Sequence, residues 1–253
     1  MLRRLFLTAL AAGAIAGVLI TAVQSVTTAP IIRHAELYES GELPAHAGLA
    51  EPSSRSLLAG LAEVLLPEAL AHGTEAHDGS AADDHGGAWA PADGLERTAY
   101  SLLANLLLGV GFALLISAGF VLHGREVTPL GGVLWGAAGF VVVTLAPGLG
   151  LPPEVPGSFA ADLQDRQLWW AAAALCAAAG LGLLAFGRGW PAKALGVVVA
   201  ALPHAVGAPQ PETLGGAVPP ELAGHFAAAS IVVSAIFWSL LGWLSSVFYR
   251  RFD

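Results

Sequence analysis

Long uninterrupted apolar runs are the feature that most constrains this 253-residue chain. A helix needs about 20 apolar residues to cross the hydrocarbon core of a bilayer. Runs that reach or approach this length cover residues 5–26, 98–122, 130–149, 168–186, 193–206 and 226–248. Charged residues make up only 12% of the chain, whereas soluble domains carry roughly 25%. Because lipid offers the backbone no hydrogen-bond partners, these runs predict an all-α, polytopic membrane bundle of about six transmembrane helices.

The first run has two interpretations. Residues 5–26 follow Arg3 and Arg4, and a basic start before an apolar stretch is typical of both a secretory signal and a first span. The run is long for a signal, and its best small-residue cleavage site, at residues 27–29, is followed by Pro30. We therefore expect an uncleaved first span.

The fifth run, residues 193–206, is barely long enough to span, and a re-entrant hairpin is the alternative. The distribution of charge favours six spans. With the N-terminus inside, the inner segments hold seven of the 11 basic residues and two of the 19 acidic residues. A re-entrant segment would place Arg250 and Arg251 outside, although basic residues normally flank the inner ends of spans. The sequence therefore predicts two cytoplasmic termini and a long outer loop over residues 27–97.

The outer loop contains an apolar stretch between two polar ones. Apolar residues recur at helical spacing from Leu57 to Leu65, so residues 54–70 predict a short amphipathic helix on the membrane surface. Residues 29–51 are polar and punctuated by proline, and residues 71–94 are rich in Gly, Ala and Asp. We expect no spanning segment in this loop.

Histidines and carboxylates in the loop are candidate metal ligands, because this ligand set suits borderline divalent ions such as Co²⁺, Ni²⁺ and Zn²⁺. The candidates are His34, Glu36, His72, His77, Asp83, Asp84 and His85. Their spacing matches no compact metal motif. Two interpretations therefore remain: a loop that collects metal with low affinity, and an acidic loop that is merely solvated. A collecting loop would lose affinity below about pH 6.5, since only neutral imidazole binds metal.

Polar residues inside or beside the apolar runs are a second group of candidates, because burying them in hydrocarbon is costly. Gln24, Asn105, His204 and His225 all lie toward the outer ends of their predicted spans. His204 follows Pro203, which frees backbone carbonyls in its helix. We expect a polar vestibule open to the outside, with His204 and His225 as metal ligands near its mouth. The alternative for His204 is a histidine that is hydrated at a helix end.

Two adjacent tryptophans, Trp169 and Trp170, begin the fourth run after Arg166. Tryptophan is enriched where helices leave the membrane. The simplest expectation is that both belong to an interfacial aromatic belt. A place at the outer vestibule is the alternative.

Several functions are excluded by what the sequence lacks or carries. It contains no phosphate-binding GxxxxGK[ST] loop, no HExxH and no GxSxG motif, so we predict neither an ATP motor nor an enzyme. The net charge of −8 argues against nucleic acid as a partner. The single cysteine, Cys176, excludes a disulfide framework and a thiolate metal cluster. We expect no tightly bound cofactor.

Longer sequence blocks point to a family. They are Ala35–Glu39, Trp89–Arg97, Gly150–Gly157 (GLPPEVPG), Arg166–Trp170 (RQLWW), Leu202–Pro209 (LPHAVGAP) and the pair Phe237–Trp238. Together they resemble the CbtA family of predicted cobalt transporter subunits, and the resemblance covers nearly the whole chain. It implies a multi-pass protein of the bacterial inner membrane that moves Co²⁺ in a vitamin B12 context. It also implies a small single-span partner, CbtB, with a histidine-rich tail.

The leading hypothesis is therefore the membrane subunit of a divalent metal uptake transporter, in which the outer loop collects the ion. The alternative is a structural or accessory subunit of a larger membrane complex without a transport role. Two GxxxG patterns, Gly13–Gly17 and Gly132–Gly136, mark closely packed helix faces. In the accessory hypothesis, such faces would serve contacts between proteins.

Overall fold

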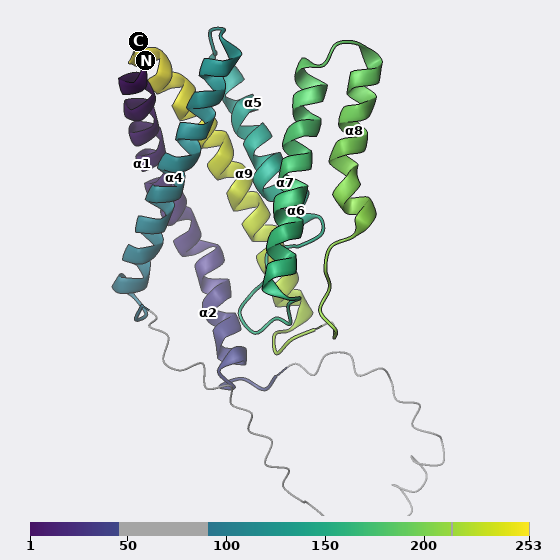
Figure 1. Cartoon of the computed structure of the whole chain (residues 1–253). Helices are drawn as coiled ribbons and strands as arrows, with labels where there is room; N and C mark the ends of the chain where they lie inside the picture. The colour runs from purple at the N-terminus through teal and green to yellow at the C-terminus, as the bar shows by residue number, and fades with distance from the viewer. Residues whose placement is uncertain (46–90, 214, 253) are drawn as a thin grey trace, which may run out of the picture.

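The computed structural model describes residues 1–45, 91–213 and 215–252 (Figure 1). Within these residues the chain is helical and forms no strand beyond one isolated bridge between Ser158 and Gly216. The elements are α1 (Leu2–Val26), α2 (Thr28–Glu39), α4 (Leu95–His123), α5 (Pro129–Phe140), η1 (Val141–Leu145), α6 (Ala146–Gly148), α7 (Leu163–Phe186), α8 (Gly189–Val206) and α9 (Pro220–Arg251). The amphipathic helix predicted for residues 54–70 lies outside the described residues.

Five helical segments of the described chain are long and apolar enough to cross a membrane. They are Leu2–Val26, Leu95–His123, Pro129–Gly148, Leu163–Phe186 and Pro220–Arg251. The remaining apolar run forms α8, an 18-residue helix that packs against α7 and returns along it (Figure 1). At 1.5 Å per residue, α8 is about 27 Å long. This length is slightly below the roughly 30 Å of a hydrocarbon core.

Helices α1, α4, α5 and α9 form a bundle in which glycines bring backbones into contact. A Cβ atom at Gly13 would overlap the backbone of Val110, and one at Gly17 would lie 2.8 Å from the carbonyl oxygen of Asn105. Likewise, a Cβ atom at Gly136 on α5 would overlap the carbonyl oxygen of Trp238 on α9. Both GxxxG patterns thus mark close packing as predicted. The contacts lie within this chain and give no support to the accessory hypothesis.

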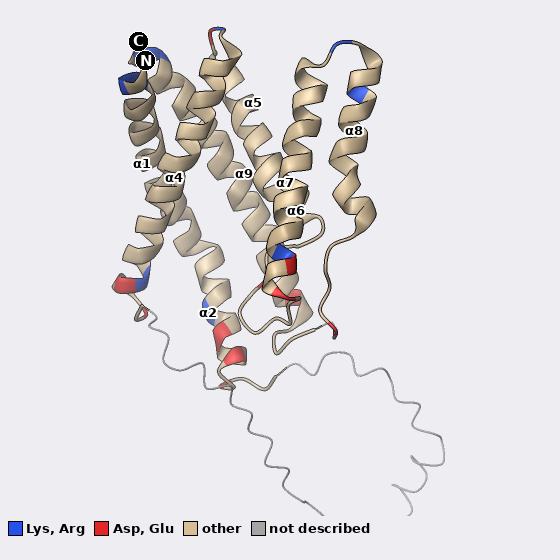
Figure 2. Ribbon diagram, viewed as in Figure 1, with Lys and Arg blue, Asp and Glu red and all other residues tan. Residues whose placement is uncertain are grey.

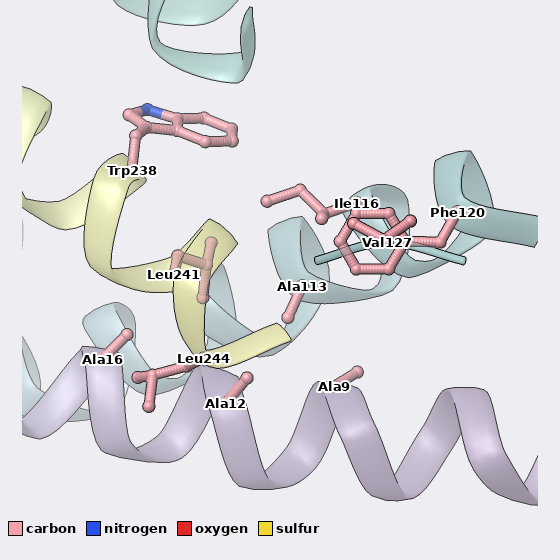
Figure 3. Packing of buried hydrophobic residues seen from close by; sticks show 10 residues of the cluster. All are labelled: Ala9, Ala12, Ala16, Ala113, Ile116, Phe120, Val127, Trp238, Leu241 and Leu244. Atoms are coloured by element: carbon pink, nitrogen blue, oxygen red, sulfur yellow. The ribbon is translucent and has the colours of Figure 1, made fainter. Parts of the chain in front are cut away.

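The core of the bundle combines small residues on α1 with large ones on α4 and α9. Ala9, Ala12 and Ala16 of α1 are fully buried, and Leu244 of α9 lies between Ala12 and Ala16 (Figure 3). The small α1 side chains allow the helices to approach, since close packing replaces the hydrophobic effect as the driving force in lipid. The larger side chains fill the space that remains.

One turn of the third apolar run is a π-helix, Val141–Leu145, between α5 and α6. The N–H of Ala146 donates to the carbonyl of Val141, five residues earlier. Pro147 follows and has no N–H to continue the helical ladder. The apolar pattern of residues 130–149 predicts one regular run and gives no sign of this turn. The π turn lies where this segment contacts α7.

Residues 28–39 form helix α2, although the sequence analysis assigned residues 29–51 to a polar loop. This expectation was wrong because one face of the segment is apolar. Ile31 and Ala35 are buried against Val155 and Val218. Tyr38 packs beside the same cluster. The spacing of Ile31, Ala35 and Tyr38 is helical, and this spacing is the sequence signal for the helix.

Charges separate between the two ends of the helical array (Figure 2). The end with both chain termini carries mainly basic residues: Arg3, Arg4, Arg125, Arg188, Lys193, Arg250 and Arg251, with Glu126 as the acidic exception among the described residues. Most acidic residues of the described chain lie at the opposite end, where α2, α7 and α9 begin or end. The two ends therefore differ in electrostatic character.

Candidate functional site

A polar pocket lies between α1, α2, α9 and the start of α4, at the end of the bundle away from the termini. Its volume is about 380 Å³. Hydroxyl and amide side chains provide most of its polar lining: Thr21, Gln24, Ser25, Thr28, Thr98, Ser101, Ser230 and Ser234. Ile32, Phe226 and Val233 contribute apolar walls. The pocket therefore offers many neutral oxygen atoms between helices whose outer faces are apolar.

Asn105 of α4 joins two pocket residues of α1. Its amide nitrogen donates to Thr21 Oγ1 at 2.9 Å and to Gln24 Oε1 at 2.6 Å. The Thr21 hydroxyl in turn donates to the carbonyl oxygen of Gly17 at 2.8 Å. The structure thus brings together Gln24 and Asn105, two of the four residues expected to share a vestibule. Such hydrogen bonds fix the polar side chains between helices, where a buried amide without partners would be costly.

Charged residues surround the same pocket. The guanidinium group of Arg97 forms a bidentate ion pair with Glu36 and a second ion pair with Asp93 at 3.0 Å. Arg33 and Asp93 also line the pocket. The Glu36 pair joins α2 to α4 across 61 residues of sequence. Glu36, a predicted metal ligand, is therefore engaged by an arginine in this structure.

A second cluster forms around Trp169, where three of the sequence blocks meet. The Trp169 indole N–H donates to the carbonyl of Pro203 at 3.3 Å, and its ring lies edge-to-face against His204 with centroids 5.7 Å apart. A Cβ atom at Gly150 would overlap the same indole. Residues 150–157, 166–170 and 202–209 are thereby joined.

The burial of Trp169 differs from the aromatic-belt expectation. Trp169 is only 8% exposed, whereas its neighbour Trp170 is 41% exposed. Nearby, Arg166 donates to Glu154 at 2.6 Å and links α7 to the preceding loop. Trp169 therefore acts as a buried contact between segments, and Trp170 has the exposure expected of a belt residue.

The described metal-ligand candidates lie on three different helices. His34 is exposed on α2 with its ring 5.6 Å from that of Tyr38, and His225 is exposed near the start of α9, next to Phe226 of the pocket. His204 is half-buried on α8. Within the described residues, no three His, Cys, Asp or Glu side chains form a group that could hold a metal. The other candidates, His72, His77, Asp83, Asp84 and His85, lie outside the described residues.

Sequence reasoning missed several polar residues of the helix interfaces. Ser230 and Ser234 are four residues apart on α9 and line the pocket together. Deeper in the bundle, Thr8, Ser117 and Ser245 are fully buried, and their hydroxyls have no hydrogen-bond partner among the described residues. Serine and threonine barely lower the hydropathy of an apolar run, so they do not stand out in the sequence. Only the helical spacing of Ser230 and Ser234 indicated that two hydroxyl groups share one helix face.

The five long apolar helices define a polytopic α-helical membrane protein, with a polar pocket at one end of its bundle. The chain belongs to the family described as "Probable cobalt transporter subunit (CbtA)", whose model matches residues 2–250. The resemblance seen in the sequence blocks is thereby confirmed. Neither the curated proteins nor the solved structures include a significant match to the chain.

Proposed function

We propose that this chain is the membrane-embedded subunit of a divalent cobalt uptake transporter. In this proposal α8 completes six spans, both termini are cytoplasmic, and the protein resides in the inner membrane of a bacterium. The match to the cobalt transporter subunit family supports the function. The concentration of Lys and Arg at the end that carries the termini supports the orientation (Figure 2).

The ion enters through the polar pocket between α1, α2, α4 and α9. The geometric observation that carries this route is the position of the pocket directly beside the end of the outer segment. Asp93, Gly94 and Arg97 line the pocket and lie at the C-terminal end of the predicted outer loop, residues 27–97. Neutral oxygen atoms of Thr21, Gln24 and the serines would replace part of the hydration shell of the ion, whereas imidazole and carboxylate groups bind borderline metals more tightly. A weakly binding pocket suits passage of the ion.

The outer segment collects the ion before it enters. His34, Glu36, His72, His77, Asp83, Asp84 and His85 are the proposed collecting residues. His204 and His225 are proposed as further metal ligands: His225 adjoins Phe226 of the pocket, whereas His204 lies on α8, outside the pocket lining. Cobalt is the cargo, and the protein holds no tightly bound cofactor and catalyses no reaction. A small CbtB-like subunit with one span and a histidine-rich tail is the proposed partner, and "subunit" in the family description supports a complex.

The test is cellular cobalt content, measured by mass spectrometry in a host that lacks its own uptake system. The chain is expressed with and without a CbtB-like partner, and nickel and zinc are measured in the same samples. We expect cobalt accumulation with the intact chain and a loss of most accumulation when deletion of residues 72–85 is combined with His204→Ala. Gln167→Ala, on the exposed face of α7 and outside the pocket, is the matched control.

Membrane abundance of each variant must be equal for the comparison to hold. Unchanged cobalt uptake in the combined variant would contradict the proposed roles of the outer loop in collecting the ion and of His204 as a metal ligand. If the folded chain accumulates no cobalt under either condition, the accessory-subunit hypothesis replaces the transport proposal. Asn105→Leu tests the route separately, because it removes the amide that binds Thr21 and Gln24 while it keeps a side chain of similar branched shape.

A further inference from the structure

Three hydroxyl residues in the bundle core differ from the hydroxyl residues elsewhere in the described helices. Thr8 on α1, Ser117 on α4 and Ser245 on α9 are fully buried, and their hydroxyls have no hydrogen-bond partner among the described residues. We call these three residues the inner hydroxyl group. A serine or threonine in a helix can satisfy its hydroxyl by donating to a carbonyl three or four residues earlier. Hydroxyls that do so in the described helices or at their ends are those of Thr21, Ser25, Thr27, Ser40, Thr98, Ser101 and Ser246.

The contacts of Tyr249 place the inner hydroxyl group in one layer of the bundle. Arg4 Nε donates to the Tyr249 carbonyl at 2.6 Å, and the Phe120 ring lies 5.5 Å from the Tyr249 ring, so this residue of α9 meets both α1 and α4. Each member of the group lies one helical turn farther from the termini than one of these contacting residues, and on the same face of its helix. The pairs are Arg4 and Thr8, Phe120 and Ser117, and Tyr249 and Ser245. The three hydroxyl residues therefore lie at one level between α1, α4 and α9, about 6 Å from the Tyr249 contact.

An apolar layer separates this group from the polar pocket. Ala12, Ala113 and Leu241 lie between the two along their helices, are fully buried, and belong to one packed cluster (Figure 3). On α9, Ser234 of the pocket precedes Ser245 by about three turns, or roughly 16 Å along the helix axis. In this structure the bundle is therefore closed between the pocket and the inner hydroxyl group.

The burial of these hydroxyls without partners opposes the closed packing. A hydroxyl that leaves water without gaining a hydrogen bond costs free energy, and buried polar groups in native cores are almost always hydrogen-bonded. If the inner ends of α1, α4 and α9 separate, water reaches all three hydroxyls together, because they lie in one layer. The cost of burying them in the closed state thus reduces the free-energy difference between the closed state and such an open state.

We propose that the inner hydroxyl group lines the inner half of the ion route and meets water when the inner ends of α1, α4 and α9 separate. Its ligand is a hydrated divalent cation, because neutral hydroxyls accept hydrogen bonds from the water shell of an ion without removing that shell. The pocket and the inner layer then open to opposite sides of the membrane in turn, with the apolar layer between them. The identity of the cargo rests on the proposed function, whereas the opening of the inner end does not.

Cysteine labelling tests whether the group meets water. The full-length chain carries Ser117→Cys or Ser245→Cys in a background in which its single native cysteine is replaced, Cys176→Ala. Membrane vesicles of both orientations are treated with a membrane-impermeant maleimide. Ser246→Cys is the matched control, because Ser246 is equally buried but has a hydrogen-bond partner and lies against Gly132 of α5.

We expect both test cysteines to react from the side of the membrane that carries the termini, about tenfold faster than the control cysteine. An open state that is populated at a few per cent is sufficient for this difference, because the closed core admits no reagent. Reaction from the opposite side alone would overturn the proposal. Rates equal to that of the control cysteine, including no reaction at any position, would also overturn it.

Removal of the hydroxyls gives a readout that a merely structural role would not give. The combined variant Thr8→Val, Ser117→Ala and Ser245→Ala keeps the layer apolar and removes its unpaired groups. We expect its thermal unfolding midpoint to rise and its cobalt uptake to fall severalfold, because only the closed state gains stability. Ser246→Ala removes a hydroxyl that has a partner, so it should not raise the midpoint and should keep uptake. A lower midpoint in the combined variant would contradict the proposal.

The two experiments distinguish this proposal from the cobalt assignment. If the test cysteines react as expected and the midpoint rises, but the wild type accumulates no cobalt, the inner opening stands and the proposed cargo is wrong. If the wild type accumulates cobalt but the test cysteines react no faster than the control, the inner opening is wrong and the cobalt assignment stands.

Discussion

The α1–α4–α5–α9 bundle and the α7–α8 hairpin both contain close helix contacts at glycine residues. They differ in how much further buried packing stabilises each unit. In both, glycine brings two backbones together: Gly136 meets Trp238 in the bundle, and Gly180 meets Gly196 in the hairpin. The bundle adds a buried core around Phe120 and Leu241. The hairpin has little buried core of its own, because Gly196 and Pro203 are the only buried residues of α8.

The hairpin is instead positioned by the contact of α7 with the π turn and α6 and by side-chain contacts near its two ends. At one end, Trp169 contacts Pro203 and the Gly150 segment. At the other, the ring of Phe186 lies 6.1 Å from that of His123 on α4. The bundle therefore distributes its stability over many contacts, whereas the placement of the hairpin depends on a few. This difference predicts how substitutions should act in each unit.

The largest effect is expected for Gly136→Val. The added side chain overlaps the Trp238 carbonyl, and backbone atoms of a packed helix cannot move aside as a flexible side chain would. We expect no folded protein to be recovered, as measured by monodispersity on size exclusion and by helical content. Gly182→Val is the control, because a Cβ atom at Gly182 on α7 meets nothing within 4 Å. Equal damage in the two variants would contradict the role of α5–α9 contact.

A smaller and local effect is expected for Trp169→Ala. Removing a buried indole typically costs about 3–5 kcal/mol. Here the loss of stability should be confined to the α7–α8 hairpin, because the bundle keeps its own core. Hydrogen exchange should rise in α7 and α8 and stay unchanged in α1 and α9. Trp170→Ala alters an exposed neighbour and should change neither the stability nor the hydrogen exchange of α7 and α8. If Trp169→Ala raises exchange equally in all helices, the two units are not separate.

The smallest effect is expected for the ion pair between α2 and α4. A double-mutant cycle of Arg97→Gln and Glu36→Gln should give a coupling free energy of about 1 kcal/mol, since both side chains are about one-third exposed. Chemical unfolding in mild detergent measures it. The Arg166–Glu154 pair, with similar exposure, provides a comparison between α7 and the loop that precedes it. A coupling near zero would show that α2 is held by its apolar face alone.

The sequence predicted the helical architecture because apolar length is a strong signal in a membrane chain. It could not predict which helices pack together. The contact of α5 with α9, rather than mainly with neighbouring α4, depends on how Gly132 and Gly136 fit Gly242, and this shape complementarity is not visible in composition. The π turn before Pro147 was also invisible, because each of its residues suits an ordinary helix.

The candidate site was predicted only in part, for a similar reason. Gln24 and Asn105 stood out because amides are rare in apolar runs, and the structure joins them. Arg97 and Glu36 were assigned to the same polar loop without any indication that they pair, since long-range ion pairs leave no periodic pattern. The helix α2 was hidden by its charged face, although its apolar positions carried the helical spacing.

The Arg97–Glu36 ion pair has a consequence for how this protein tolerates changes in chain length. It holds together the two points between which residues 40–92 run, so the bundle need not depend on the length of that connection. The entropy of closing a connection grows only logarithmically, by about 0.6 kcal/mol for each doubling of a flexible segment. We therefore expect changes in the length of this connection to leave the packing of the described helices intact.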